Sequence, residues 1–343
     1  MAYAATVLDE FRLSYDKSNL DAFTHRMSQY GAYATYLKDT ANLIPGAQEL
    51  VAERRTAGRT VSIPILNRKT FTTNSVRACT AKTDQGTSAY VTPSWTTVES
   101  GFMMVPSEHK GNNISYQNAF NHLANGIERA FLQDADTDAV TDLIASLNAY
   151  IGAEDNPFAV TASYLQVPLA YHDTFFEEFK SIMQADDLPY DNVNIVGSPR
   201  VQAMVNYYAN QGAGNSANTT FQFGNYNFAY SNRVTISTAY LGSAYGMPVG
   251  SLAYLSWVDE DAKAGHKSGD GKEWYVQELP LLGHNVGVLY QSSCADKSSL
   301  FTGGQATLAE SFSFSFDRAF VTAADAIATP NAGVIYGIEF LKV

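Results

Sequence analysis

The pattern between residues 113 and 148 constrains the fold of this chain more than any other feature. Apolar side chains recur there every three or four residues, which is typical of one face of a long amphipathic helix. The first residues of this stripe are Tyr116, Phe120, Leu123, Ile127, Phe131 and Ala135, and the stripe resumes at Val140, Leu143, Ile144 and Leu147. A single helix of this length would be about 50 Å long and would span the whole molecule. Two ordinary helices, broken near Asp134 to Thr137, are the alternative.

Length and composition favour a protein that hides part of its surface against partners. The chain has 343 residues, which suggests two lobes or one lobe with large extensions. Only 16% of the residues are charged, where about a quarter is usual, and aromatic residues are abundant. The net charge of -12 makes the chain a poor candidate for gripping nucleic-acid phosphates. We interpret the only tight basic group, Arg54, Arg55 and Arg59, as a solvated turn.

The sequence carries no local motif for a chemical site. Its two cysteines, Cys79 and Cys294, form no pair at metal-binding spacing, and no two histidines stand at H-x-x-H or H-x-x-x-H spacing. The run Asp134-x-Asp-x-Asp resembles the start of a calcium loop. However, alanines stand where that loop needs its glycine and its closing glutamate, so a carboxylate-rich helical surface is favoured. We therefore predict no catalytic, cofactor-binding or metal residues, no cofactor and no enzymatic activity.

The sequence also shows no membrane segment and no nucleotide-binding or hydrolase motif. No apolar run approaches 18 residues, and the start of the chain lacks the features of a signal peptide. We expect a soluble cytoplasmic protein that does not contact membranes.

Residues 1 to 57 are expected to form an N-terminal arm. A narrow apolar seam runs along it, at Leu20, Phe23, Met27, Tyr30, Ala34 and Leu37. Such a narrow seam suits a helix that lies on a surface rather than in a core. Pro45-Gly46 stops this helix, and a second short helix is expected from Ala47 to Arg55.

Residues 58 to 111 are expected to form one long two-stranded hairpin. The outgoing strand alternates Val61, Ile63 and Ile65 on one face. The returning strand is expected from about Tyr90 to Val105, after a polar tip. Because Trp95, Phe102 and Met104 add to its apolar surface, we expect a neighbouring subunit to cover the hairpin.

The rest of the chain predicts an α+β lobe followed by returning strands. Helices are expected at 171–183 and from Ser198-Pro199 to about Asn210, with a strand at 191–197 between them. Further strands are expected at 221–230, 234–240, 252–258 and 274–282. Two polar loops, 210–220 and 259–273, are expected in this lobe, and at least one of them should be mobile. The strict alternation of 311–316 and the apolar run of 333–341 predict terminal strands.

This order of elements resembles that of the major capsid proteins of tailed bacteriophages, which have the Hong Kong 97-type fold. The resemblance is carried by Gly58-Arg-Thr-Val-Ser-Ile-Pro-Ile at the start of the hairpin, by Gly101-Phe-Met-Met-Val-Pro before the long helix, and by Asn192-Val-Asn-Ile-Val-Gly-Ser-Pro-Arg in the α+β lobe. The resemblance covers nearly the whole chain and depends on the order of the elements and on the kinds of residues within them.

The resemblance implies a division of the α+β chain into the parts of that fold. Residues 1–57 would be the N-terminal arm and 58–111 the extended β-hairpin loop. Residues 112–165 and 300–343 would form the peripheral domain with its spine helix, and 166–299 the axial domain at the centres of capsomers.

The resemblance also implies a function. The chain would be a structural protein that assembles with itself, as hexamers and pentamers, into an icosahedral shell. That shell would enclose double-stranded DNA without sequence-specific binding. Scaffolding, portal and decoration proteins would be further partners. The protein would be found in the virion capsid after assembly in the host cytoplasm.

Two other classes of protein stay open. An encapsulin-like bacterial compartment has the same fold but encloses a cargo enzyme. A cytoplasmic enzyme could assemble its site from residues that are distant in the sequence.

Overall fold

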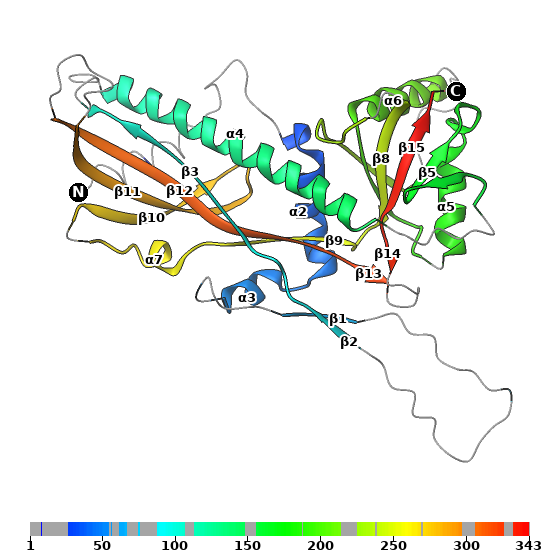
Figure 1. Ribbon diagram of the computed structural model, residues 1–343, viewed down its shortest axis with the longest axis horizontal. Helices are drawn as coiled ribbons and strands as arrows, with labels where there is room; N and C mark the ends of the chain where they lie inside the picture. The colour runs from blue at the N-terminus through cyan, green and yellow to red at the C-terminus, as the bar shows by residue number, and fades with distance from the viewer. Residues whose placement is uncertain are drawn as a thin grey trace.

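The computed structural model describes residues 8, 27–54, 56, 62–66, 75, 88–106, 113–147, 156–186, 188–213, 225–236, 239–268, 270–296, 306–325 and 332–342. In these residues the protein is α+β, with two large β-sheets that lie side by side and a helix between them (Figure 1). Within the described part of the chain, no helix combines the length and the apolar character needed to cross a membrane.

The long helix is present and unbroken. It is α4, Asn113–Ala145, with 33 residues, so the alternative of two shorter helices is wrong. Most of the predicted stripe is buried, but Leu123 and Ile144 are 37% and 42% exposed. Ala124 takes the buried position beside Leu123, because at 3.6 residues per turn a step of four residues from Phe120 stays closer to the buried face than a step of three.

One face of α4 packs on a five-stranded antiparallel sheet. The strands of this sheet are β3 (Thr96–Met104), β9 (Leu252–Trp257), β10 (Lys272–Leu279), β11 (His284–Asp296) and β12 (Ala306–Thr322). Their order is β10-β11-β12-β3, and β9 pairs with the last part of β12. We call this sheet and α4 the long-helix lobe.

The alternation along β12 explains why this sheet packs against α4. Phe312, Phe314 and Phe316 lie on one face and are buried, whereas the serines between them lie on the opposite face and are only partly buried. The rings meet those of the helix: the centroids of Phe120 and Phe312 are 4.9 Å apart, and those of Phe131 and Phe316 are 5.3 Å apart. Burying each such ring stabilises the fold by about 2 to 3 kcal/mol.

The second sheet is mixed and has its own core. Its strands are β4 (Ala159–Thr161), β5 (Tyr164–Val167), β6 (Val193–Gly197), β7 (Tyr226–Tyr230), β8 (Tyr240–Pro248) and β15 (Tyr336–Leu341). They stand in the order β4-β5-β15-β8-β6-β7, with β5 parallel to β15 and β6 parallel to β7. Helices α5 (Phe175–Ala185) and α6 (Pro199–Ala213) pack on this sheet. We call this unit the mixed-sheet lobe.

Helix α2, Gly31–Leu43, lies between the two lobes (Figure 1). It follows the short 3₁₀ helix η1, Met27–Gln29. Tyr33 and Tyr36 of α2 are fully buried in the main core, so the prediction of a surface helix is wrong here. The narrow apolar seam led to an underestimate of how much of the α2 surface is buried, because this helix also buries the polar residues Thr35 and Asp39. The seam residues Leu20 and Phe23 lie outside the described residues.

Carboxylates tie α2 to its neighbours. Asp39 accepts hydrogen bonds from the backbone N–H groups of Gly250, Ser251 and Leu252, each at 2.8–2.9 Å. The buried Asp136 of α4 accepts from the backbone N–H of Tyr33 at 3.1 Å and from the hydroxyl of Ser231. Polar contacts thus connect α2 with both the long-helix lobe and the mixed-sheet lobe. Because each contact satisfies a buried polar group, losing one leaves a desolvated partner behind.

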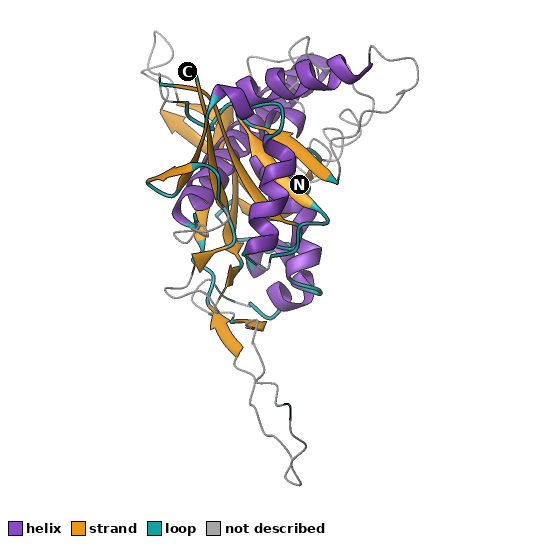
Figure 2. Ribbon diagram, turned by 90° about the vertical axis from the view of Figure 1, so that its right-hand side faces the viewer, coloured by secondary structure: helices purple, strands orange, loops and turns teal. Residues whose placement is uncertain are grey.

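Among the described residues, only the base of the expected hairpin is a pair of antiparallel strands. After α3, Ala47–Ala52, strand β1 (Ile63–Leu66) pairs antiparallel with β2 (Ser88–Val91) in a two-stranded sheet of its own. The returning strand does not continue this pair, because β3 joins the long-helix lobe and pairs with β12. In Figures 1 and 2, the pair β1–β2 lies below the helices and the larger sheets. The expected polar tip, 79–88, lies outside the described residues except for Ser88, which begins β2.

We expected a neighbouring subunit to cover the apolar residues of the hairpin, and this expectation is wrong for several of them. Phe102 packs against Phe120 and Phe312 of the same chain. Ile63 and Met104 are buried in this subunit's own cores. Forming β3 within the larger sheet covers its apolar face, and no neighbour is needed for that.

The division into lobes also differs from the expected boundaries. Residues 252–296 were expected in the axial domain, but they form β9, β10 and β11 of the long-helix lobe. Residues 336–341 were expected with the spine helix, but β15 is a central strand of the mixed sheet. Pairing between strands that are distant in the sequence decides both assignments, and periodicity along the chain does not reveal it.

Candidate functional site

The base of the hairpin is built around one buried arginine. Arg54, at the end of α3, is 2% exposed. Its Nη2 lies 2.7 Å from Oδ2 of Asp317 on β12, and Thr97 on β3 donates to the other oxygen of that carboxylate at 2.7 Å. Burial lowers the pKa of Arg54, and the ion pair with Asp317 acts against this shift.

Two tryptophans flank this guanidinium. The centroid of the Trp95 ring is 4.0 Å from the guanidinium carbon, and that of the Trp257 ring is 4.7 Å from it. The indole N–H of Trp257 donates to the backbone carbonyl of Arg54. Such cation–π contacts contribute about 2 kcal/mol when they are desolvated. We call Arg54, Trp95, Thr97, Trp257 and Asp317 the arginine clamp.

The clamp joins the two ends of the hairpin. The chain leaves the body at Arg54 and reaches β1 at Ile63, and it returns from β2 to the body at Trp95. Stacking Trp95 on Arg54 fixes the two ends to each other, and Asp317 and Trp257 fix both to the sheet. The interpretation of Arg54 as part of a solvated turn is therefore wrong. The other members of that basic group, Arg55 and Arg59, lie outside the described residues.

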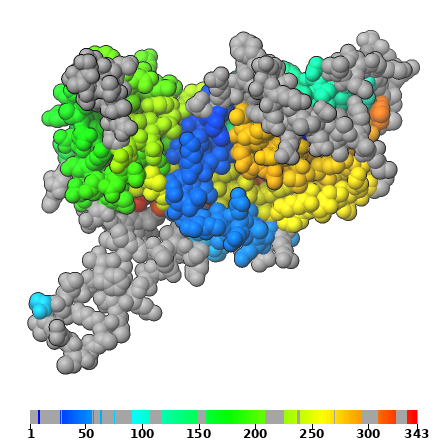
Figure 3. All heavy atoms as spheres, turned by 180° about the vertical axis from the view of Figure 1, so that it is seen from behind, coloured from blue at the N-terminus to red at the C-terminus, as the bar shows by residue number. Residues whose placement is uncertain are grey.

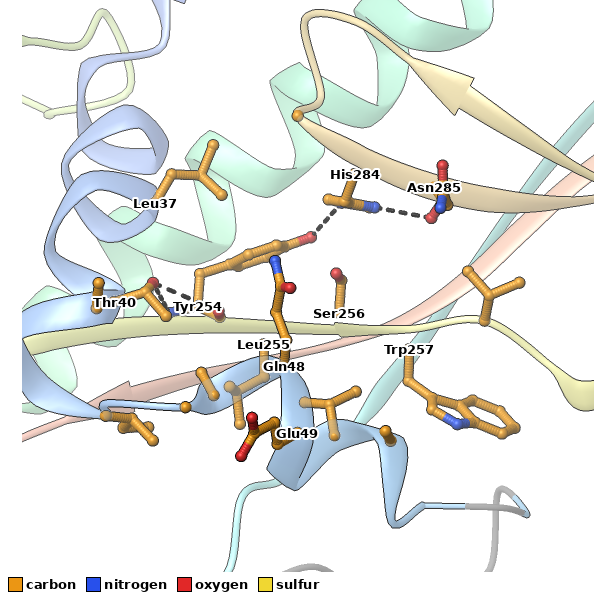
Figure 4. A pocket seen from close by; sticks show the side chains of 18 of the residues that line it. Leu37, Thr40, Gln48, Glu49, Tyr254, Leu255, Ser256, Trp257, His284 and Asn285 are labelled. Atoms are coloured by element: carbon orange, nitrogen blue, oxygen red, sulfur yellow. Dashed lines mark hydrogen bonds between the residues drawn. The ribbon is translucent and has the colours of Figure 1, made fainter. Parts of the chain in front are cut away.

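A groove of about 940 Å³ lies beside the clamp (Figure 4). It runs between α2 and α3 on one side and β9, β10 and the start of β11 on the other. Figure 3 shows this face, with α2 and α3 in blue beside the yellow and orange segments. The apolar residues lining the groove include Leu37, Ala41, Ile44, Ala47, Val51, Ala52, Leu255, Trp257, Val258 and Val276, and its charged residues are Glu49, Lys263 and Glu278. We call it the α3 groove.

One wall of the α3 groove holds a neutral histidine. The Tyr254 hydroxyl lies 2.9 Å from Nε2 of His284, and Nδ1 of His284 lies 3.0 Å from the backbone carbonyl of Asn285 (Figure 4). Burial lowers the pKa of His284 to about 4. The imidazole is therefore uncharged at neutral pH and contributes no positive charge to the groove.

Helix α7, Glu260–Lys263, adds acidic residues next to the groove. Asp259 and Asp261 are exposed there, and Glu49 and Glu278 are exposed on α3 and β10. Lys263 is 2.8 Å from Glu260, so its charge is offset locally. The groove therefore combines an apolar floor with walls that carry an excess of negative charge.

The aspartates that resembled a calcium loop serve two different neighbours. Asp134 and Asp138 receive hydrogen bonds from Nη2 of the buried Arg318, at 2.7 and 2.5 Å. Asp136 points to the other side and is fully buried against α2 and Ser231. The prediction of a carboxylate-rich surface is thus wrong for Asp136. Among the described residues, no group of three histidines, cysteines or carboxylates is arranged to hold a metal ion.

In the run Tyr171-His172-Asp173 an acid and a base are adjacent in the sequence, but the histidine belongs to a core. His172 is buried, its Nε2 lies 3.2 Å from the carbonyl of Val167, and its ring meets that of Phe340 edge to face. Burial lowers its pKa. Tyr171 and Asp173 are exposed, so these three side chains do not converge.

Sequence reasoning missed both the clamp and the groove. The clamp gathers residues 54, 95, 97, 257 and 317, which lie on four segments with no fixed spacing. One signal was available: the chain has only three tryptophans, and two of them flank Arg54. The loop 259–273 was also misplaced. It forms α7 and packs Ala262 on the long-helix sheet, so it is not a polar loop of the axial lobe. The other loop, 210–220, begins as the end of α6, and from residue 214 it lies outside the described part.

Comparison with known protein families finds no match to the sequence, and comparison with curated proteins finds none either. Solved structures are similar in fold. The structure of Mycobacterium phage Cain has a TM-score of 0.48 at 10% identity and covers 90% of each chain. The capsid of Ralstonia phage GP4 has a TM-score of 0.47 at 12% identity over 83% of this chain and 84% of that one. Mycobacterium phage Adephagia has a TM-score of 0.46 at 12% identity over 90% of each chain. Because these TM-scores lie below 0.5, we infer function from the geometry of the chain itself.

Proposed function

We propose that this protein is a structural subunit that assembles with itself into the shell of a tailed bacteriophage. In this proposal it is the major capsid protein, forms hexamers and pentamers, and encloses double-stranded DNA without reading its sequence. The mixed-sheet lobe would lie at the capsomer centres, as the axial domain, and the long-helix lobe would lie at the periphery.

The observation that carries the proposal is the two-stranded sheet β1–β2. It is separate from both large sheets, and 21 residues, 67–87, join its strands. A two-stranded ribbon is at best marginally stable alone in water. Ile63 and Val91 pack the base of the ribbon on the subunit's own core, and we propose that the ribbon extends from this base to contact a second subunit.

The charge of the chain agrees with a shell that does not bind its contents tightly. The net charge of -12 disfavours a lasting grip on phosphates. Within the described residues, no metal-binding group offers a competing chemical role. The arginine clamp and the junction carboxylates act structurally, because each is occupied by partners within the subunit.

Electron microscopy and light scattering of the purified protein test this proposal. We expect closed shells, or rings of five and six subunits, together with concentration-dependent scattering. A compact 37.4 kDa particle at all concentrations and salts would contradict it and favour an enzyme. If particles isolated from the natural source enclose a cargo enzyme instead of DNA, the chain is an encapsulin-like compartment protein.

A further inference from the structure

The turn between β10 and β11, residues 280–283, is held by side chains from two helices. Oε1 of Glu128 on α4 accepts hydrogen bonds from the backbone N–H groups of Leu281 and Leu282, at 2.8 and 3.3 Å. The Tyr33 hydroxyl on α2 donates a hydrogen bond to the backbone carbonyl of Leu282, at 2.6 Å. We call the turn together with Glu128 and Tyr33 the turn latch. It joins the end of the β10–β11 pair to both α4 and α2.

The turn covers the carboxyl group of Glu128. Glu128 is 0% exposed, whereas Leu281 is partly exposed and Gly283, at the end of the turn, is exposed. Gly283 has a φ of +74°, which glycine adopts without strain, and such a residue can absorb a backbone movement. Displacing these few residues would bring water to the carboxyl group without moving α4.

The charge of Glu128 depends on pH in the neutral range. Burial raises the pKa of Glu128 to about 7, and the two hydrogen bonds from the turn act in the opposite direction. In an open turn the carboxyl group would be hydrated and would return to its ordinary pKa. Because the pKa in the closed turn is the higher one, the closed turn is fully favoured below about pH 4.5 and loses this advantage as the pH rises through about 7.

The aromatic and imidazole groups near Glu128 keep their protonation over this range. Tyr33 is the side chain of α2 on which the charge of Glu128 acts, and burial raises its pKa well above the usual value. Tyr33 meets Tyr254 of β9, whose pKa burial also raises. Burial lowers the pKa of His284 on β11 to about 4, so its imidazole is neutral above pH 5. Arg318 of β12, whose charge acts on these three groups, is paired with carboxylates of α4.

We propose that the turn latch is a conformational switch, which is closed when Glu128 is protonated and opens locally when Glu128 ionises, while the rest of the subunit stays folded. The inference goes beyond the proposed capsid role and does not depend on it, because all parts of the latch belong to one subunit. Gly283, His284 and Asn285 line the α3 groove, so opening the latch would move one wall of this groove. The proton on Glu128 would thus control the shape of the groove.

Hydrogen exchange of the unassembled subunit tests the switch. Mass spectrometry of a peptide that contains residues 281–283 gives the opening equilibrium of the turn, after correction for the pH dependence of intrinsic exchange. Between pH 5 and pH 8 we expect this equilibrium to rise by about 50- to 100-fold. Glu128→Gln keeps an oxygen that accepts from the turn but cannot ionise, and should limit the rise to about threefold. The matched control, Glu177→Gln on the exposed side of α5, should behave like the parent.

Urea separates local opening of the turn from global unfolding. Exchange through a small opening depends weakly on urea because little surface becomes exposed, whereas exchange through global unfolding depends on urea steeply. We expect a weak dependence for residues 281–283 and a steep one for peptides from the paired strands β11 and β12.

Tyr33→Phe tests the second contact of the latch. Removing the hydroxyl takes this donor away from the Leu282 carbonyl, and should raise the opening equilibrium about three- to tenfold at both pH 5 and pH 8. The ratio between the two pH values should stay as in the parent, since Glu128 is unchanged.

Three results would overturn the switch. They are an opening equilibrium that does not rise between pH 5 and pH 8, a rise that Glu128→Gln retains, and a urea dependence of residues 281–283 as steep as that of β11 and β12. Unchanged opening in Tyr33→Phe would show that α2 does not hold the turn. If Glu128→Gln does not fold, the parent and the Tyr33→Phe chain still decide between local and global opening. Failure of the subunit to form shells would leave the switch standing.

Discussion

Buried charges with defined partners hold this subunit together at the scale of single residues. Arg54 and Arg318 are both almost completely buried. Each pairs with carboxylates on a different element, so each connects parts of the chain that are far apart in sequence. Such pairs add little net stability compared with apolar packing, but removing one member leaves an uncompensated charge.

Replacing Arg54 with methionine should destabilise the subunit by about 3 to 5 kcal/mol, because it leaves the buried carboxylate of Asp317 without its cation. Urea unfolding of the unassembled subunit measures this loss. Lys272→Met, which breaks the exposed pair with Asp270, is the control and should cost little stability. Equal effects of the two changes would show that the clamp does not bear on stability.

Glu128 should make stability depend on pH near neutrality. It is fully buried on α4 and accepts hydrogen bonds from the backbone N–H groups of Leu281 and Leu282, at 2.8 and 3.3 Å. Burial raises its pKa to about 7, although these two bonds act in the opposite direction. Because the folded pKa is above that of the unfolded chain, the stabilising contribution is complete below about pH 4.5 and is lost as the pH rises through about 7.

The variant Glu128→Gln should remove this dependence. We expect it to match the parent near pH 4 and to be more stable near pH 8, by up to about 3 kcal/mol. Urea unfolding across that range measures the difference, with Glu177→Gln on the exposed side of α5 as the control. A parallel pH dependence in parent and variant would show that Glu128 does not titrate near neutrality in the folded state.

At the scale of elements, two glycines give opposite predictions. Gly126 lies in the interior of α4, is exposed, and has nothing within 4 Å of the position that a Cβ would occupy. Gly31 opens α2, where a Cβ would lie 2.4 Å from the backbone of Tyr230. Thermal unfolding should show Gly126→Ala to be stabilised by about 0.5 to 1 kcal/mol and Gly31→Ala to be clearly destabilised. Destabilisation by Gly126→Ala would mean that this face of α4 is covered in solution.

Some of the helices and strands could be predicted from the sequence, and others could not. Helix α4 and strand β12 were predictable, because the residues of their buried faces recur with the period of a helix or of a strand. Strand β6 was predictable because it is a short apolar run. Strand β8 was mostly missed, since Gly242, Ser243 and Gly246 leave no alternation when both faces are buried. Strand β11 was missed as well. The α+β class could be predicted from such local patterns.

The clamp and the groove could not be predicted in this way. Trp95 and Asp317 lie far apart in the sequence, and the reason for burying Arg54 exists only when α3, β3, β9 and β12 meet. Likewise, α2 is a core helix because both lobes cover it. The apolar seam of α2 alone does not show that two lobes pack against this helix. Sites built from contacts between elements require the topology, which the periodicity of one segment does not determine.

At the scale of the whole molecule, the hairpin should be separable from the folded body. The described residues of both large cores all come from other parts of the chain than 67–87. Replacing this segment with a two-residue Asn-Gly turn should leave the circular dichroism spectrum and the thermal midpoint nearly unchanged, while electron microscopy should show few or no shells. Normal shells from the shortened chain would mean that assembly does not use the hairpin.

The place of β15 in the mixed sheet has a consequence for biosynthesis. This strand follows every other strand of its sheet in the chain, yet it lies between β5 and β8. The mixed sheet therefore cannot close until residues 336–341 have emerged from the ribosome. Nascent or prematurely terminated chains would lack the strand that joins the two halves of this sheet. If the protein assembles as proposed, this order of folding would keep unfinished chains out of the growing particle.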